Sequence, residues 1–318
     1  MRNMYVKVAI PYSKINTILK NQNFKRVIFH IDLQSICKGL YQKNNIFFEI
    51  NYFINNKKPA TQLIDEYKIL LNKLYKIYKI YSPFFITFYD DGINKQNTTI
   101  SSSYKNGRST FSDFLQDDDT ELFKKIKKNY FVEIEKYFNK PNLSKVYYLK
   151  EYEADFVPHY VIMNNLFNSK HQNTLNVILS NDKDLLQTCK FKNTIQITNR
   201  FFPSKSGKKQ LGMDVYNNTT AIQYIYNNFK VGQLTAKYIP LILALMGDKA
   251  DQIPGLKGIG AAKAIKLIQN YNLPSELCEL KQYSNLPKII LDDLDLVIRN
   301  YKLTSFEEQL NRSNLTEY

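Results

Sequence analysis

Four short apolar runs of this sequence are each followed at once by acidic residues. The runs cover residues 27–31, 84–89, 146–149 and 177–180, and the acids after them are Asp32, Asp90 with Asp91, Glu153 with Asp155, and Asp182 with Asp184. Carboxylates that lie close together raise one another's pKa, and divalent cations relieve this repulsion. Hard cations such as Mg²⁺ prefer oxygen ligands, so clustering of these acids predicts a divalent metal site.

Each acid taken alone has a simpler explanation. Acidic residues are common at helix N-caps and in first helical turns, which is where a strand-to-helix connection places them. That explanation is the better one for a single acid. For all the acids together the metal site is the stronger interpretation, because acid follows every one of the four runs.

Spacing within the acid pairs supports convergence. Asp182 and Asp184 are two residues apart, which in extended backbone places both on one face. Asp248 and Asp251 are three residues apart and share a face if their stretch is helical.

Glu153 and Asp155 converge only under one condition. On a regular helix they would point about 200° apart, so they must lie at a strand-to-helix turn. Pro158 favours such a turn, because proline is tolerated in a first helical turn and costly further in.

The elements that must position these acids alternate between strands and helices. Apolar residues at helical spacing run from Thr61 to about Tyr81, between the first two apolar runs. Alternation of this kind predicts an α/β fold with a central, mainly parallel sheet flanked by helices. Ligands gather at the carboxyl ends of the strands in such sheets, which is where the acids stand. After about Val231 the pattern becomes helical.

The most specific segment is residues 245–264, which contains GDKADQIPGLKGIG. Its Gly-Ile-Gly core predicts a hairpin between two helices, where glycine allows close backbone approach and the next helix offers N–H groups to a phosphate. Lysines add positive charge there. The residues predicted to contact nucleic acid are Gly255, Lys257, Gly258, Gly260, Lys263 and Lys266.

Composition indicates a polyanionic partner. The 318 residues carry 44 Lys and Arg against 29 Asp and Glu, a formal net charge of +15. Nucleic acid is the commonest such partner, although a basic proteome would give the same bias. Three scattered cysteines and three scattered histidines predict a reducing compartment without a zinc site. With no apolar run long enough for a membrane span and no convincing signal peptide, we expect an intracellular, cytoplasmic protein, in the host cytoplasm if viral.

The chain resembles the 5′ nuclease (flap endonuclease) superfamily. This family includes phage 5′-3′ exonucleases with ribonuclease H activity, which are the closest match, and the 5′-nuclease domain of bacterial DNA polymerase I. The resemblance covers about residues 25–310. The motifs that carry it, in the family's order, are Ile31-Asp32, Phe88-Tyr89-Asp90, Tyr104-Lys105-Asn106-Gly107-Arg108, Glu153-Ala154-Asp155, Asp182 to Gln187, the GDKADQIPGLKGIG segment, and Ile298 to Leu303.

The resemblance implies a hydrolase with two divalent cations, Mg²⁺ or Mn²⁺. It assigns Asp32, Asp90, Glu153 and Asp155 to the first metal, and Asp182, Asp184, Asp248 and Asp251 to the second. Two cations roughly 4 Å apart can activate a water and stabilise the leaving oxygen. Lys105 and Arg108 would polarise the scissile phosphate, and Tyr104 would stack on an unpaired base.

The resemblance also implies the organisation of the chain. We expect an N-terminal extension at 1–24, a PIN-like α/β nuclease domain at 25–235, and a helix-hairpin-helix (H3TH) DNA-binding region at 236–318. A helical arch would span 105–141, although an amphipathic packing helix explains that pattern equally well. The expected partner of this monomer is DNA with a 5′ flap, nick or 5′ end, or an RNA–DNA hybrid, with a monovalent cation at the hairpin and no membrane contact.

Three features depart from the family pattern. Phe156 stands where bacterial and phage members usually have a further Asp. The stretch 92–103 lacks an arginine that many bacterial members carry. Either Asp90 or Asp91 could be the ligand, and the distance to Tyr104 favours Asp90.

Two other functions fit parts of the pattern. A DNA-structure binder without activity is disfavoured by the retained acids, because clustered carboxylates without metal would repel phosphates. A PIN-like ribonuclease acting on free RNA is disfavoured by the glycine hairpin, which suits duplex backbone.

Overall fold

A six-stranded sheet forms the centre of the molecule, in the order β3-β2-β1-β4-β5-β6. Neighbouring strands are parallel except that β6 is antiparallel to β5. The strands are β1 (Arg26–Asp32), β2 (Phe84–Asp90), β3 (Ser144–Leu149), β4 (Thr174–Leu179), β5 (Thr194–Pro203) and β6 (Lys209–Tyr216). The four predicted strands and the mainly parallel sheet are confirmed, whereas the β5–β6 hairpin was not predicted.

This computed structural model describes most of the chain. The described residues are 11–33, 35, 61–90, 95–105, 135–136, 138–150, 152–166, 173–203, 209–227, 229–230 and 234–313. The predicted arch at 105–141 falls almost entirely outside them, as do Arg108 and Asp91.

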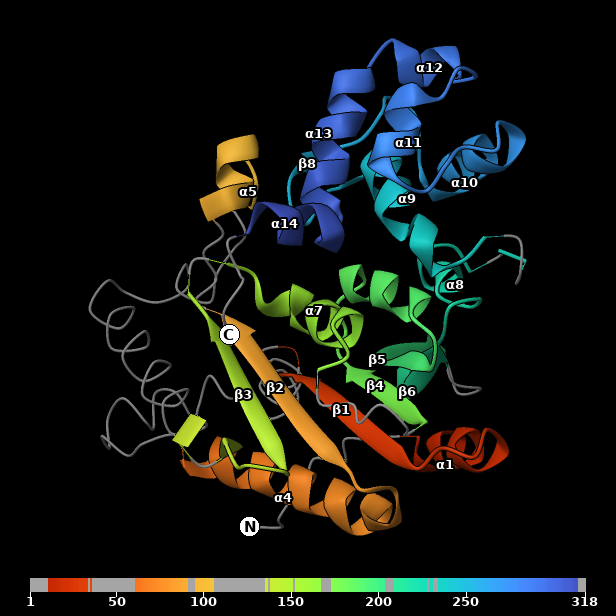
Figure 1. Cartoon of the computed structure of the whole chain (residues 1–318). Helices are drawn as coiled ribbons and strands as arrows, with labels where there is room; N and C mark the ends of the chain where they lie inside the picture. The colour runs from red at the N-terminus through yellow and green to blue at the C-terminus, as the bar shows by residue number, and fades with distance from the viewer. Residues whose placement is uncertain are drawn as a thin grey trace.

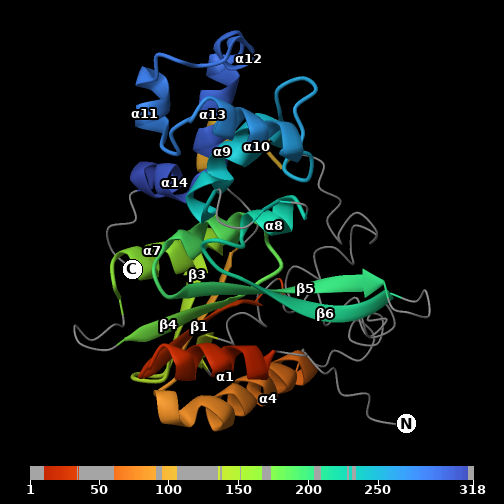
Figure 2. The same ribbon diagram turned by 90° about the vertical axis from the view of Figure 1, so that its right-hand side faces the viewer.

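One face of the sheet is covered by two helices, α1 (Tyr12–Asn21) and α4 (Thr61–Tyr78), the second continuing as the 3-10 turn η1 (Lys79–Tyr81). Their apolar side chains pack on those of β1, β2 and β4, with Ile15, Leu19 and Leu74 fully buried. Figure 2 shows both helices side by side below the sheet. The N-terminal segment, which had no functional interpretation from its sequence, therefore completes the core through α1.

The opposite face is covered by short elements that directly follow the strands. They are η3 (Ala154–Phe156) and α7 (Val157–Met163) after β3, and η4 (Asp184–Lys190) after β4. Their buried side chains Ala154, Val161 and Leu185 pack on Ile28 and Ile86 of the sheet. The acids that open η3 and η4 are thus placed on this face.

Helices beyond the sheet gather on its α7 side, opposite α1 and α4 (Figures 1 and 2). They are α8 (Ile222–Ile225), η5 (Ala236–Tyr238), α9 (Ile239–Met246), α10 (Ala261–Asn270), α11 (Leu277–Gln282), α12 (Lys288–Leu291), α13 (Leu294–Thr304) and α14 (Phe306–Arg312), with a two-stranded pair of β7 (Gly247–Asp248) and β8 (Ile253–Pro254). Their core includes Leu186 and Cys189 of η4. Helix α5 (Lys95–Ile100), which follows β2, lies against α13. No helix among the described residues is long and apolar enough to cross a bilayer.

Candidate metal centre and nucleic-acid interface

The strand order brings together the acids that were assigned to the first metal, which we call the first acid group. Strands β3, β2, β1 and β4 are consecutive neighbours and run parallel, so their carboxyl ends share one edge of the sheet. Asp32 and Asp90 are the last residues of β1 and β2, and both are buried. The predicted convergence of strand-end acids is therefore what the topology produces.

Both carboxylate oxygens of Asp32 accept hydrogen bonds. One of its oxygens accepts a hydrogen bond from the backbone N–H of Ser35 at 2.8 Å, and the other accepts from the hydroxyl of Ser180 at 2.5 Å. Burial, with the nearby charges of Asp182 and Asp90, raises the pKa of Asp32 to about 7 although both hydrogen bonds favour its ionised form.

Glu153 and Asp155 stand at the strand-to-helix turn that their spacing required. Glu153 is the N-cap of η3 with an extended backbone, and Pro158 lies at the start of α7. Asp90 accepts the backbone N–H of Ala154 at 2.8 Å, which ties this turn to β2. Burial, followed by the charges of Asp182 and Asp32, raises the pKa of Asp155 well above its ordinary value.

Tyr104 and Lys105 both contact Glu153. The Tyr104 hydroxyl donates to the two carboxylate oxygens at 3.0 and 3.2 Å, and the Lys105 ammonium pairs with one of them. Lys105 Nζ is also 4.0 Å from Asp251, and its backbone N–H donates to the Asp251 carbonyl at 2.9 Å. Although burial lowers its pKa, Glu153 and Asp251 together raise it well above its ordinary value, so Lys105 is a fixed cation between the two acid groups.

The structure corrects the interpretation of Tyr104 as a base-stacking residue. Its ring is 3% exposed and packs in a cluster with Ile253, Leu303 and Ile100. A ring covered on this scale has no face open to a nucleobase. Tyr104 instead orients Glu153 and joins the sheet edge to the helical region.

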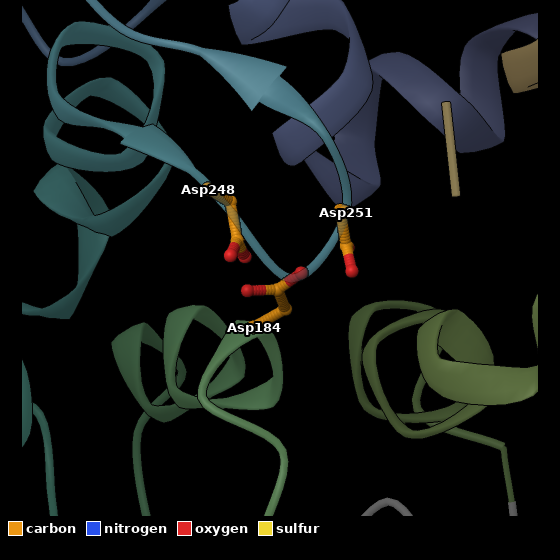
Figure 3. Close-up of side chains that lie close together, drawn as sticks. All are labelled: Asp184, Asp248 and Asp251. Atoms are coloured by element: carbon orange, nitrogen blue, oxygen red, sulfur yellow. The ribbon is translucent and has the colours of Figure 1, made fainter. Parts of the chain in front are cut away.

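The second acid group is compact. Asp184, Asp248 and Asp251 each offer a carboxylate oxygen, and these oxygens lie within 4.8 Å of one another. Figure 3 shows Asp184 reaching from η4 toward the two aspartates of the loop between β7 and β8. The predicted convergence on this site is thus present for three of its four acids.

The fourth acid, Asp182, lies between the two groups. Its Oδ1 accepts the backbone N–H of Asp184 at 2.9 Å, so the pair forms a tight turn rather than the extended backbone assumed from the spacing. After burial, its charge is the largest influence raising the pKa of both Asp155 and Asp184. The two acid groups therefore belong to one electrostatically coupled centre.

Asp248 and Asp251 do not lie on a helix, contrary to the condition attached to their spacing. Asp248 is the last residue of β7 and Asp251 lies in the turn that leads to β8, and the backbone N–H of Ala250 donates to Asp248 Oδ1 at 3.0 Å. The turn closes because two glycines meet: a Cβ on Gly247 would lie 2.3 Å from the backbone nitrogen of Gly255, and Gly247 has a φ of +75°. Close backbone approach in this segment thus occurs at Gly247 and Gly255.

Asn300 holds this loop, a role not recognised from the sequence. It is fully buried on α13, and its side-chain amide donates to the carbonyls of Ala244 at 3.0 Å and Pro254 at 2.6 Å. These carbonyls lie on either side of the β7–β8 turn. The position of Asn300 within the family-like closing segment was the available signal.

The donor set suits a hard divalent cation. Asp184 Oδ1 is buried and accepts no hydrogen bond from the described residues, which leaves it available for a cation. Every candidate ligand is a carboxylate oxygen, the donor that Mg²⁺ and Mn²⁺ favour. Lys183 stands beside the site, with its ammonium 2.5 Å from Asp248 Oδ2. Phe156, at the position of the missing family acid, is buried in the apolar core and offers no ligand.

The Gly-Ile-Gly turn was predicted to lie directly between two helices. It instead joins β8 to α10, because the β7–β8 pair intervenes after α9. Gly258 has a φ of +75°, which favours glycine, whereas at Gly260 a Cβ would meet nothing within 4 Å. Lys257, Lys263 and Lys266 are exposed around the start of α10, and Lys263 donates to the Gly258 carbonyl at 2.9 Å. No side chain caps the N-terminus of α10, so its first backbone N–H groups lack a side-chain acceptor among the described residues.

Proteins named DNA polymerase I and 5′-3′ exonuclease are similar to this chain in sequence. DNA polymerase I of Borreliella burgdorferi is 33% identical over 146 residues, which is 43% of this chain and 14% of that protein. A 5′-3′ exonuclease of Buchnera aphidicola is 25% identical over 269 residues, 84% of this chain and 80% of that protein. The chain therefore matches only a small part of the DNA polymerase I relatives. No family model matches it.

Solved structures share the fold. The T5 5′-exonuclease with bound divalent metal ions (zinc) superposes with a TM-score of 0.58 at 17% identity, covering 88% of this chain and 89% of that one. The T5 D15 protein crystallised with metal ions gives the same TM-score at 16% identity and covers 88% and 90%. The sequence relatives and this shared fold confirm the resemblance of the chain to the 5′ nuclease superfamily.

Proposed function

We propose that the chain is a structure-specific 5′-3′ exonuclease and flap endonuclease that hydrolyses phosphodiester bonds with two divalent cations. The observation that carries the proposal is the coupled acid centre, in which Asp184, Asp248 and Asp251 converge beside the strand-end acids. Bound cations at such a centre would activate a water and stabilise the leaving oxygen. The named 5′-3′ exonucleases among the relatives and the metal-bound T5 structures support it.

The protein residues in this mechanism have separate roles. Asp32, Asp90, Glu153 and Asp155 would hold one cation, and Asp182, Asp184, Asp248 and Asp251 the other. Lys105 lies between the groups, bound to Glu153 and near Asp251, so its charge is placed to polarise a phosphate that bridges them. Arg108, which lies outside the described residues, is proposed to assist.

The exposed hairpin is the proposed contact with duplex DNA. Lys257, Lys263 and Lys266 surround uncapped backbone N–H groups, an arrangement that attracts phosphate. Residues 236–318 would form the H3TH DNA-binding region, with a monovalent cation at the hairpin, and 25–235 the nuclease domain. The T5 D15 flap endonuclease has been solved with DNA and metal ions, which supports this assignment. Removal of 5′ flaps or RNA primers would be its role in replication or repair.

One gel tests the proposal. Flapped DNA, nicked duplex and an RNA–DNA hybrid, each labelled at the 5′ end, are incubated with the protein and Mg²⁺, Mn²⁺ or a chelator. We expect release of short 5′ fragments with either ion and none with the chelator. Binding without cleavage under every condition would favour a DNA-structure binder, and cleavage of free single-stranded RNA in preference to the three substrates would favour a PIN-like ribonuclease.

A further inference from the structure

Lys183 lies among the acids of the second group. In the sequence it separates Asp182 from Asp184, and its Nζ is 2.5 Å from Asp248 Oδ2. The Asp248 side chain is 6% exposed, whereas that of Lys183 is 30% exposed. An ammonium therefore reaches from the edge of the site to one of the buried carboxylates that the proposed cation requires.

Both oxygens of Asp248 are already engaged. Oδ1 accepts the backbone N–H of Ala250 at 3.0 Å, and Oδ2 accepts the Lys183 ammonium. A divalent cation that uses Asp248 as a ligand must approach the same carboxylate as this ammonium. Two positive charges sharing one carboxylate repel each other, and the repulsion is strong in a buried site.

Lys183 can leave the site more easily than Lys105 can. Lys105 is held at both ends, by its backbone N–H on the Asp251 carbonyl and by its ammonium on Glu153. Lys183 lies in the loop that leads into η4, and its side chain is the more exposed of the two. A long, flexible side chain at an edge can swing its charge into water at small cost.

We propose that Lys183 competes with the divalent cation for Asp248 and so sets the affinity of the second metal site. The inference rests on the proposed two-cation function. The lysine neutralises part of the buried negative charge, and a bound cation replaces it. Displacement turns the ammonium outward, where it adds to the positive charge available to a phosphate backbone. Cation occupancy and local attraction for nucleic acid are thereby linked.

The test measures Mn²⁺ binding to the whole chain by isothermal titration calorimetry and electron paramagnetic resonance, in the absence of nucleic acid. Lys183→Met removes the competing charge, and we expect Mn²⁺ to bind about fivefold more tightly, the equivalent of one partly buried ion pair. Lys183→Arg keeps a cation that pairs well with a carboxylate, so its Mn²⁺ affinity should equal or fall below that of the unaltered chain.

Lys249→Met is the matched control. Lys249 is exposed in the β7–β8 turn, directly after Asp248, and makes no ion pair among the described residues. Its removal changes the net charge by the same amount without freeing Asp248, so we expect less than a twofold change, since exposed charges are screened.

Three results would overturn the proposed competition between Lys183 and the cation. Weaker or unchanged Mn²⁺ binding by Lys183→Met overturns the competition, because it shows that the lysine aligns Asp248 or has no influence. Equal tightening in Lys249→Met also overturns it, since net charge alone would then account for the effect. If Lys183→Met does not fold, tighter binding by Lys183→Arg has the same consequence. A separate control tests the metal site itself. If the unaltered chain binds no Mn²⁺, or if Asp184→Asn binds it equally well, the proposed metal site does not exist.

Discussion

The two acid groups of this centre are built in different ways. Asp32 and Asp90 end adjacent parallel strands, and hydrogen bonds from Ser35 and Ala154 orient their carboxylates. The second group instead combines Asp184, at the start of η4, with two aspartates of the β7–β8 turn more than sixty residues later. The first group depends on the sheet, and the second on how the helical region packs against it.

This difference has a physical consequence. A sheet edge places its acids wherever the strands pair, so the repulsion among them is opposed by the whole hydrogen-bonded ladder. In the β7–β8 turn no such ladder opposes the repulsion among the acids. The turn is held instead by single contacts, among them the approach of Gly247 to Gly255 and the hydrogen bonds from the Asn300 amide. The second group should therefore be the more sensitive to substitutions that do not touch an acid.

The largest expected effect comes from Asp184→Asn, which tests whether both groups act as one centre. Loss of one carboxylate from the second group should lower the rate of flap cleavage at least about 1,000-fold, because the cation there is needed for leaving-group stabilisation. DNA binding in Ca²⁺, measured by fluorescence anisotropy, should persist. Cleavage within tenfold of the unaltered chain would show that the strand-end group is sufficient.

The next effect concerns the pH dependence of the first group. Burial raises the pKa of Asp32 to about 7, above its ordinary value near 4, so the folded chain binds a proton that the unfolded chain releases. With a chelator present, the contribution of Asp32 to the free energy of unfolding should therefore be largest below about pH 4. It should fall by up to about 4 kcal/mol as the pH rises to about 7. Urea titrations of the chain and of Asp32→Asn would measure it; an equal slope in both assigns the pH dependence to other groups.

Gly247→Ala tests the closure of the second group's loop. A methyl there meets the backbone of Gly255 and requires a left-handed φ, so we expect a loss of about 3 kcal/mol in the free energy of unfolding. Gly260→Ala is the control, because its φ is −102° and the space around it is open. Similar stabilities for the two variants would contradict the assigned role of the glycine contact.

Asn300→Ala gives the smallest expected effect and separates the groups most directly. It removes the hydrogen-bond donor of the Ala244 carbonyl, in a buried contact, and of the Pro254 carbonyl, in a partly buried one, at a cost of about 2 kcal/mol in the free energy of unfolding. Calorimetry should show weaker Mn²⁺ binding at one of the two proposed sites, with the other unchanged. Asn176→Ala, which removes a buried hydrogen bond to His30 within the sheet, should lower stability without that selective loss.

The sequence by itself determined the alternation of strands and helices, the acids at the strand ends and the glycine-containing turn before α10. These are local features: a buried strand appears as a short apolar run, and an acid that follows it is carried to the sheet edge by backbone direction alone. The choice of Asp90 over Asp91 is consistent with the buried carboxylate found there, while Asp91 lies outside the described residues.

Only the tertiary structure decided which distant groups meet. The pairing of Lys183 with Asp248 depends on how the helical region packs on η4, and the burial of Tyr104 against Ile253 on how the segment after α5 meets the β7–β8 turn. The clamp of Asn300 on that turn depends on the packing of α13 against α9. The β5–β6 hairpin and the packing of α1 on the sheet also escaped prediction. Contacts of this kind are set by the shape of a shared core, and the periodicity of a single segment carries no information about the surface it will meet.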